Sequence, residues 1–170
     1  MNATTLFRIL SFILLPIAFF FIIMDLIAIV MALGNPSLLF PVFLITGMII
    51  YVIVSFYFLL MGVNRKLALG ASVKDWIKVN AYVTLFLGFQ FMLVSVSIFY
   101  MGSANLQEFA DKAMAAQPNM SSQMNSGLFL KMLKGMAYFF FFLSLALLVH
   151  ISICFKLLKE YAHLFLPKEV

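Results

Sequence analysis

The residues of this sequence that could do chemistry are ionisable and amide side chains placed inside long apolar stretches. Asp25, Gln90 and His150 each stand in such a stretch. On membrane-insertion scales a charged side chain at the centre of a span costs about 2.5–3.5 kcal/mol, so Asp25 requires a proton or a compensating partner. Histidine exchanges protons near neutral pH, and an amide can hydrogen-bond to either group. These three residues form a candidate intramembrane polar site.

Two interpretations of this candidate site remain open. In the first, Asp25 is a proton or cation site, and Gln90 links it to His150. In the second, the same side chains only hydrogen-bond across helices and lock their packing. At a rise of about 1.5 Å per residue, Asp25 lies about 12 Å and His150 about 20 Å from the outer end of its segment. A direct contact between them would therefore require helix tilt or an intermediary.

Other kinds of site lack the residues that they need. A structural zinc site takes four nitrogen or sulfur ligands, usually closely spaced, whereas this chain offers only Asp25 on one segment and His150 and Cys154 on another. Cys154 is the only cysteine, which excludes an intrachain disulfide. The sequence has no GxxxxGK loop for phosphates and no serine, histidine and aspartate at a common depth. We therefore expect no metal, no cofactor and no enzymatic activity.

The composition indicates the medium in which these residues work. The chain has 170 residues, of which 65% are hydrophobic and 10% are charged, and its mean hydropathy is +1.14. A soluble domain has about 25% charged residues. This composition excludes a water-soluble globule and predicts a single membrane domain over residues 1–170.

Four stretches are long enough to span a bilayer, because a hydrocarbon core about 30 Å thick requires about 20 apolar residues of helix. A Gly-Asn-Pro-Ser turn beginning at Gly34 divides the first two stretches. Backbone groups in lipid must be satisfied within the segment, so each stretch is expected to be a helix. The predicted fold is an all-α integral membrane protein, a four-transmembrane-helix bundle with spans at about 9–33, 38–63, 79–101 and 135–155.

The lysines and arginines predict the orientation, because short loops rich in positive charge stay on the cytoplasmic side. Both termini and the loop after the second span are therefore expected to be cytoplasmic, in a plasma membrane or a bacterial inner membrane. The net charge of +5 favours anionic lipid head groups on the inner face as a partner. Nucleic acid is not expected, because the basic residues do not alternate with aromatic residues on a soluble face. The eight residues on the inner side are Arg8, Arg65, Lys66, Lys74, Lys78, Lys156, Lys159 and Lys168, against Lys112, Lys131 and Lys134 on the outer side.

Two further features concern packing. The outer connection, 102–127, is expected to contain a short amphipathic helix that ends before Pro118 and lies at the interface or caps the bundle. Small residues allow helices to approach closely. The candidate helix-packing positions are Ala18 and Ala28, which share a face with Asp25, together with Gly47 and Ser55.

These observations leave two functions open. The first is an accessory or self-associating helical bundle that acts through protein and lipid contacts, as a homo-oligomer or with a membrane-protein partner. It follows from abundant packing surface and little convergent polar chemistry. The alternative is a small proton- or cation-coupled transporter that uses Asp25 and requires dimerisation to form a full pathway.

Overall fold

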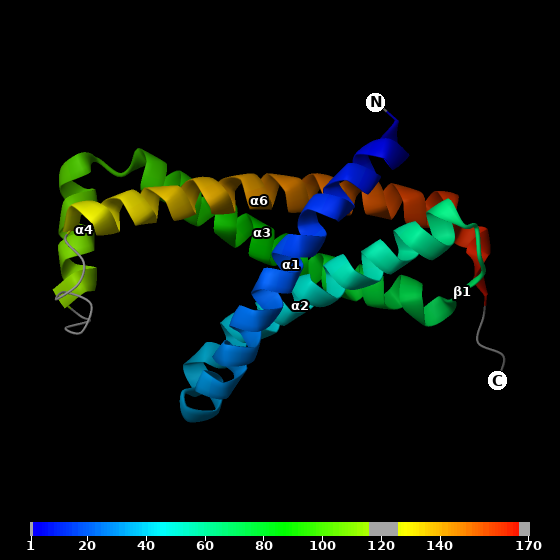
Figure 1. Cartoon of the computed structure of the whole chain (residues 1–170), viewed down its shortest axis with the longest axis horizontal. Helices are drawn as coiled ribbons and strands as arrows, with labels where there is room; N and C mark the ends of the chain where they lie inside the picture. Colours follow the sequence, from blue (N-terminus) through cyan, green and yellow to red (C-terminus); the bar gives the residue numbers. More distant parts are fainter. Residues whose placement is uncertain (1, 116–125, 167–170) are drawn as a thin grey trace. The chain divides into compact units, whose positions relative to one another are not determined.

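Helices make up nearly all of the described chain. The computed structural model describes residues 2–115 and 126–166. A short 3-10 turn, η1 (Pro36–Leu38), follows the first helix, and the second helix continues into a π-helical segment, η2 (Phe58–Asn64). The helices drawn in Figure 1 are α1 (Ala3–Gly34), α2 (Leu39–Tyr57), α3 (Ala71–Tyr100), α4 (Ser103–Ala115) and α6 (Ser126–Glu160).

Four segments are long and apolar enough to cross a membrane, which confirms the prediction of four long apolar helices. Membrane insertion itself stays a prediction. The helices are longer than the predicted spans: the first and fourth contain 32 and 35 residues. Hydropathy marks only the apolar part of a segment, whereas backbone hydrogen bonding extends a helix into its polar ends. The four segments are Ala3–Gly34, Pro36–Asn64, Ala71–Tyr100 and Ser126–Glu160.

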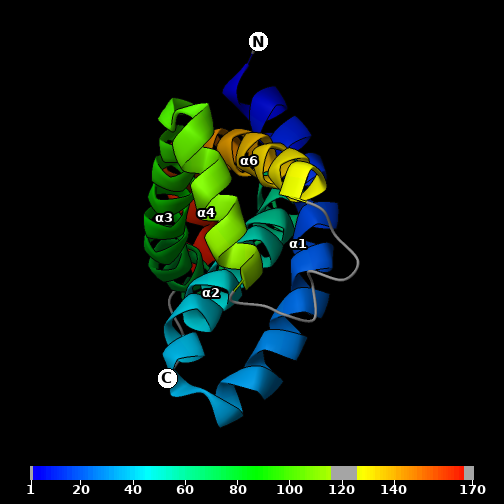
Figure 2. The same ribbon diagram turned by 90° about the vertical axis from the view of Figure 1, so that its left-hand side faces the viewer.

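The turn between α1 and α2 is where the sequence placed it. The side chain of Asn35 accepts hydrogen bonds from the backbone N–H of Ser37, at 3.2 Å, and from its hydroxyl, at 2.7 Å. Pro36 begins the short 3-10 turn, where its missing N–H costs nothing. The two helices meet at this turn and form a hairpin (Figures 1 and 2).

The face of α1 that is buried repeats every three or four residues, the spacing that keeps one side of a helix against its neighbours. Asp25 belongs to this face, so its side chain is enclosed by protein rather than exposed on the outer surface. The buried residues of α1 are Phe7, Ser11, Leu14, Ala18, Phe21, Asp25 and Ala32.

The chain divides into two compact units. The first contains residues 1–88 and 146–170, and the second contains residues 89–145. All four long helices contribute to the first unit, because the first part of α3 and the last part of α6 pack there with α1 and α2. The second unit holds the remaining parts of α3 and α6 together with α4. The single domain over 1–170 stays a prediction.

The connection between the third and fourth long helices contains a helix, as the sequence predicted. α4 buries Leu106 and Ala110. On its exposed side Lys112 forms an ion pair with Glu108, four residues earlier, at 2.7 Å. The interfacial position of α4 stays a prediction, and the remainder of the connection, 116–125, lies outside the described residues.

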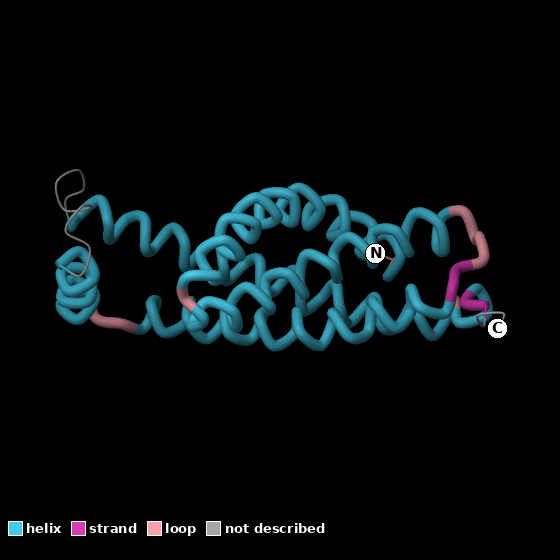
Figure 3. Tube along the Cα trace, turned by 90° about the horizontal axis from the view of Figure 1, so that it is seen from below, coloured by secondary structure: helices cyan, strands magenta, loops and turns pink. Residues whose placement is uncertain are grey.

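One end of the first unit gathers segments that are far apart in the sequence. Arg8 of α1 donates a hydrogen bond to the side chain of Asn64, at the end of η2, at 2.7 Å. Past Lys66, which has a positive φ of 54°, strand β1 (Leu69–Gly70) pairs in parallel with β2 (Phe165–Leu166), drawn in magenta in Figure 3. The beginning of α1, the loop after η2 and the segment after α6 therefore lie together.

Gly47 lies where α2 approaches α3 closely. A Cβ atom at this position would stand 2.6 Å from Cγ1 of Val83, closer than two carbon atoms can pack. Valine is stiff about χ1 in a helix, so the clash cannot be relieved by a simple rotation. Of the other predicted packing positions, Ala18 and Ser55 are buried and Ala28 is half-buried.

We expect Gly47→Ala to destabilise the protein by about 1–3 kcal/mol, the usual cost of overpacking a close contact. The matched control is Gly135→Ala, also inside a long helix, where an added Cβ meets nothing within 4 Å. The control should be neutral or slightly stabilising because alanine favours helix more than glycine does. Thermal unfolding of the purified variants, followed by circular dichroism, measures both. Equal stability of the two variants would contradict the close contact.

Candidate functional site

His150 joins three helices in the core of the first unit. Its side chain is 0% exposed. Nε2 lies 2.9 Å from the hydroxyl oxygen of Ser11 on α1, and Nδ1 lies 2.7 Å from the hydroxyl oxygen of Tyr51 on α2. Both ring nitrogens are therefore engaged, each by a different helix. We call His150, Ser11 and Tyr51 the histidine junction.

The direction of these hydrogen bonds follows from the number of protons available. The Ser11 hydroxyl donates to the backbone carbonyl of Phe7 at 2.8 Å. A hydroxyl has only one proton to donate, so Ser11 must accept from Nε2–H of His150. A fully buried ring with no carboxylate beside it favours the neutral form, in which Nδ1 is unprotonated and accepts from the Tyr51 hydroxyl. The result is a directed chain from Tyr51 through His150 and Ser11 to the Phe7 carbonyl, with a neutral imidazole.

Aromatic rings close the junction. The ring of Phe7 stacks on the imidazole of His150 at a centroid distance of 4.5 Å and an interplanar angle of 20°. Phe58 in turn meets Phe7 edge to face at 6.5 Å. Ser11 and Tyr51 are also buried, so protein encloses the whole junction. For His150 this geometry favours a packing role over proton transfer.

Asp25 has a different environment. It is 4% exposed, and its Oδ2 accepts a hydrogen bond from the Thr46 hydroxyl of α2 at 2.6 Å. Its Oδ1 is the one buried side-chain oxygen or nitrogen in the described part of the chain with no hydrogen-bond partner. A buried polar atom left unpaired costs about 1–3 kcal/mol, and more when it is charged. A proton, a water molecule, a cation or a donor from another chain could satisfy Oδ1.

The structure does not bring Asp25 and His150 together. His150 bonds to Ser11 of α1, and Asp25 lies on the same helix 14 residues later. At a rise of about 1.5 Å per residue, Ser11 and Asp25 are about 20 Å apart along α1. Gln90 belongs to the second unit, where it lines a surface cavity of about 500 Å³ with Phe91, Phe140 and neighbouring aliphatic side chains. A link from Asp25 to His150 through Gln90 stays a prediction.

The partners of the predicted residues were not identified from the sequence. Ser11 carried a usable signal, because it stands two heptads before Asp25 and therefore shares its helix face. Tyr51 stands four residues from both Gly47 and Ser55, on the packing face of α2. Thr46 carried no comparable signal. Spacing places a residue on a face, but it does not say which side chain of another helix will meet it.

The remaining buried polar groups of the first unit are satisfied within their own helices. The side chains of Ser55 and Thr84 donate to the backbone carbonyls of Val52 and Asn80. This pattern is common for hydroxyl residues in helices. In residues 2–115 and 126–166, no three His, Cys, Asp or Glu side chains are close enough to hold a metal ion.

Comparison with protein-family models, curated proteins and solved structures finds no match to this chain. Two arrangements of its own residues therefore bear on the function. The histidine junction is closed and fully paired, whereas the Asp25 carboxylate is enclosed but half-paired.

We expect Tyr51→Phe to lower the free energy of unfolding by about 1–3 kcal/mol, because the change leaves Nδ1 of His150 buried without a donor. Tyr57→Phe is the matched control on the same helix, since Tyr57 is exposed. Thermal unfolding in detergent would compare the two variants. If Tyr51→Phe were as stable as Tyr57→Phe, the hydrogen bond to His150 would have no structural role.

Proposed function

We propose that this chain is a multi-pass membrane protein that acts as an accessory or self-associating helical bundle, through contacts with proteins and lipids, and that it is not an enzyme. One observation carries the proposal: the buried polar groups of the first unit are nearly all paired internally, while large apolar side chains cover its outside. Such a molecule offers contact surfaces rather than an open reaction site.

The apolar outside is present on every long helix. Val30 of α1 is 68% exposed, Phe43 of α2 is 58% exposed and Leu93 of α3 is 67% exposed. In water a continuous surface of this kind would aggregate. In a bilayer it contacts lipid chains, and small differences in packing and hydrogen bonding select contacts with other helices. These exposures support an integral membrane location.

The distribution of charge supports cytoplasmic termini. Arg8 contacts Asn64, and β1 pairs with β2, so the start of the chain, the loop after η2 and the segment after α6 share one end of the first unit. Arg65 and Lys66 follow directly after η2, and Lys74 lies near the start of α3, so these three residues belong to the same end of the first unit. Positive charge gathered at one end is the pattern of the cytoplasmic side, in a plasma or bacterial inner membrane, next to anionic head groups.

Photo-crosslinking in native membranes tests this function. Replacement of exposed Phe20 or Phe43 by benzoylphenylalanine keeps an aromatic ring at each position. We expect irradiation to trap a second copy of the chain or a discrete membrane-protein partner from at least one of these positions. Self-association is distinguished from chance encounter by repeating the irradiation after dilution into excess lipid, where a specific product persists. Adducts to lipid alone, at both positions, would overturn the proposal.

The second candidate function is a proton- or cation-coupled transporter that uses Asp25. The observation in its favour is the buried, unpaired Oδ1, which is placed to take up a proton or a cation. Gln90 and His150 would serve as secondary contacts. Since His150 is closed within the histidine junction, Asp25 would carry most of the chemistry. A second copy of the chain would complete the pathway.

Asp25→Asn separates the two functions. The amide oxygen of asparagine still accepts a hydrogen bond from Thr46, so we expect the free energy of unfolding to change by no more than about 1 kcal/mol. Proteoliposomes containing a pH-sensitive dye then report proton or cation flux. On the bundle proposal, wild-type and Asp25→Asn proteoliposomes are no more permeable than protein-free liposomes. Flux through the wild type that the variant lacks would instead establish transport.

A further inference from the structure

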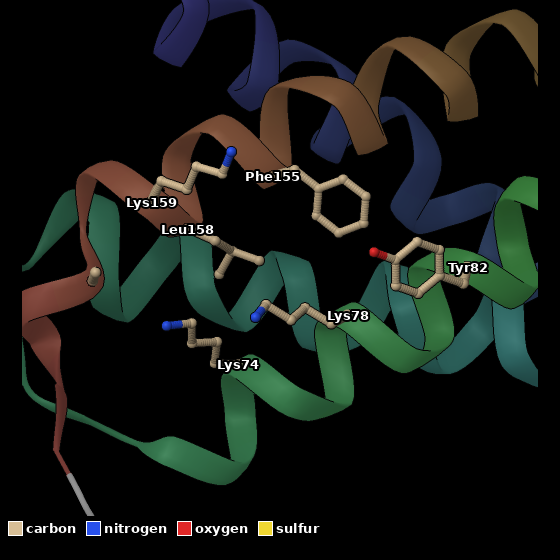
Figure 4. Close-up of a pocket in the computed structure, with 7 residues that line it drawn as sticks. Lys74, Lys78, Tyr82, Phe155, Leu158 and Lys159 are labelled. Atoms are coloured by element: carbon tan, nitrogen blue, oxygen red, sulfur yellow. The ribbon is translucent and has the colours of Figure 1, made fainter.

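A basic cavity lies between α3 and α6 in the first unit. Its volume is about 490 Å³, and Figure 4 shows its side chains rising from the two helices, with the hydroxyl of Tyr82 directed toward the space between them. The lining residues are Lys74, Lys78 and Tyr82 of α3, Phe155, Leu158 and Lys159 of α6, and Ala162 of η3 (Ala162–Leu164), the 3-10 turn that follows. We call this cavity the lysine groove.

The groove is graded from charged to aromatic along its length. Lys74, Lys78 and Tyr82 are spaced four residues apart, which places them in a row on one face of α3. Tyr82 packs against Phe155 of α6, with ring centroids 5.6 Å apart. Four residues after Phe155, toward the other end of the groove, comes Lys159. The change from ammonium groups to aromatic rings takes about 12 Å, at a rise of about 1.5 Å per residue.

Among the described residues, the lysines of the groove have no acidic ion-pair partner. The only ion pair in the described part of the chain joins Lys112 and Glu108. The ammonium group of Lys74 lies 5.7 Å from the ring centroid of Phe165, a cation–π contact that leaves its charge uncompensated. Three like charges around one cavity repel one another and attract an anion.

We propose that the lysine groove binds the phosphate-bearing head group of an anionic phospholipid. The lysines take the phosphate, the Tyr82 hydroxyl donates a hydrogen bond to it or to the adjoining ester, and Phe155 with Leu158 contacts the start of the acyl chain. This inference rests on the proposed membrane location. A free phosphate ion would use only the charged end of the groove, whereas the gradation fits an amphiphile.

The depth of the groove agrees with this ligand. Trp76 stands between Lys74 and Lys78 on α3 and is 55% exposed. Tryptophan is enriched at the level of lipid head groups, where its ring meets the acyl boundary and its N–H meets the polar layer. The lysines of α3 therefore lie at head-group level and Tyr82 lies deeper, in the same order as the parts of a phospholipid.

Binding of defined lipids to the purified full-length protein, counted by native mass spectrometry, tests the proposal. We expect the wild type to bind phosphatidylglycerol in preference to phosphatidylcholine. The double variant Lys78→Gln/Lys159→Gln should bind phosphatidylglycerol about thirty-fold more weakly, because each lysine near an anionic group contributes a factor of about five. The matched control Lys66→Gln/Lys156→Gln removes the same charge from exposed lysines outside the groove and should keep wild-type affinity.

Three further measurements make the test specific. Lys78→Arg/Lys159→Arg should restore binding, and circular dichroism establishes that each variant is folded. Phe155→Ala should weaken binding of phosphatidylglycerol but not of inorganic phosphate. Equal losses in the groove and control variants, no preference for phosphatidylglycerol, or complete displacement by inorganic phosphate would each overturn the proposal. Crosslinking at Phe20 and Phe43 does not involve these lysines, so failure of lipid binding with intact crosslinks removes this inference alone.

Discussion

The histidine junction is the interaction on which the first unit depends. His150 accepts a hydrogen bond from Tyr51 and donates one to Ser11, so one imidazole ties α6 to both helices of the α1–α2 hairpin. Hydrogen bonds between membrane helices contribute only about 0.6 kcal/mol on average. A pairing of helix faces that removed both hydroxyls would leave two buried ring nitrogens without partners, at about 1–3 kcal/mol each. The junction therefore specifies which faces meet more than it adds to stability.

The sequence predicted the elements of the fold well, because hydropathy over 20 or so residues reports directly on helices of membrane-spanning length. The turn at Asn35 and Pro36 could be predicted equally well from its residue types. Other features carry no periodic signal. The two-residue strands β1 and β2 pair because chain segments that are distant in sequence are brought together. The segment η2 is π-helical, which hydropathy does not distinguish from an α-helix.

The candidate site was predicted in part for the same reason. Asp25 and His150 stand out because ionisable groups are rare in apolar segments, but each is explained by a partner that the sequence did not identify. His150 is completed by two hydroxyls, whereas Asp25 has one, from Thr46. An ionisable residue in an apolar segment therefore has two different environments in this protein. The ring of His150 is fully paired, whereas the carboxylate of Asp25 has one unpaired oxygen. Only the pairing of helix faces distinguishes them.

The polar interior and the lysine groove belong to the same unit but have opposite requirements. The histidine junction is satisfied by the chain itself, whereas the three lysines of the groove have no ion-pair partner among the described residues. These lysines repel one another across α3 and α6, and α6 is also the helix that carries His150. An anionic lipid that binds the folded state stabilises it by mass action. On the proposed membrane location and orientation, the lipid composition of the inner leaflet would then influence how firmly α6 is held against α1 and α2.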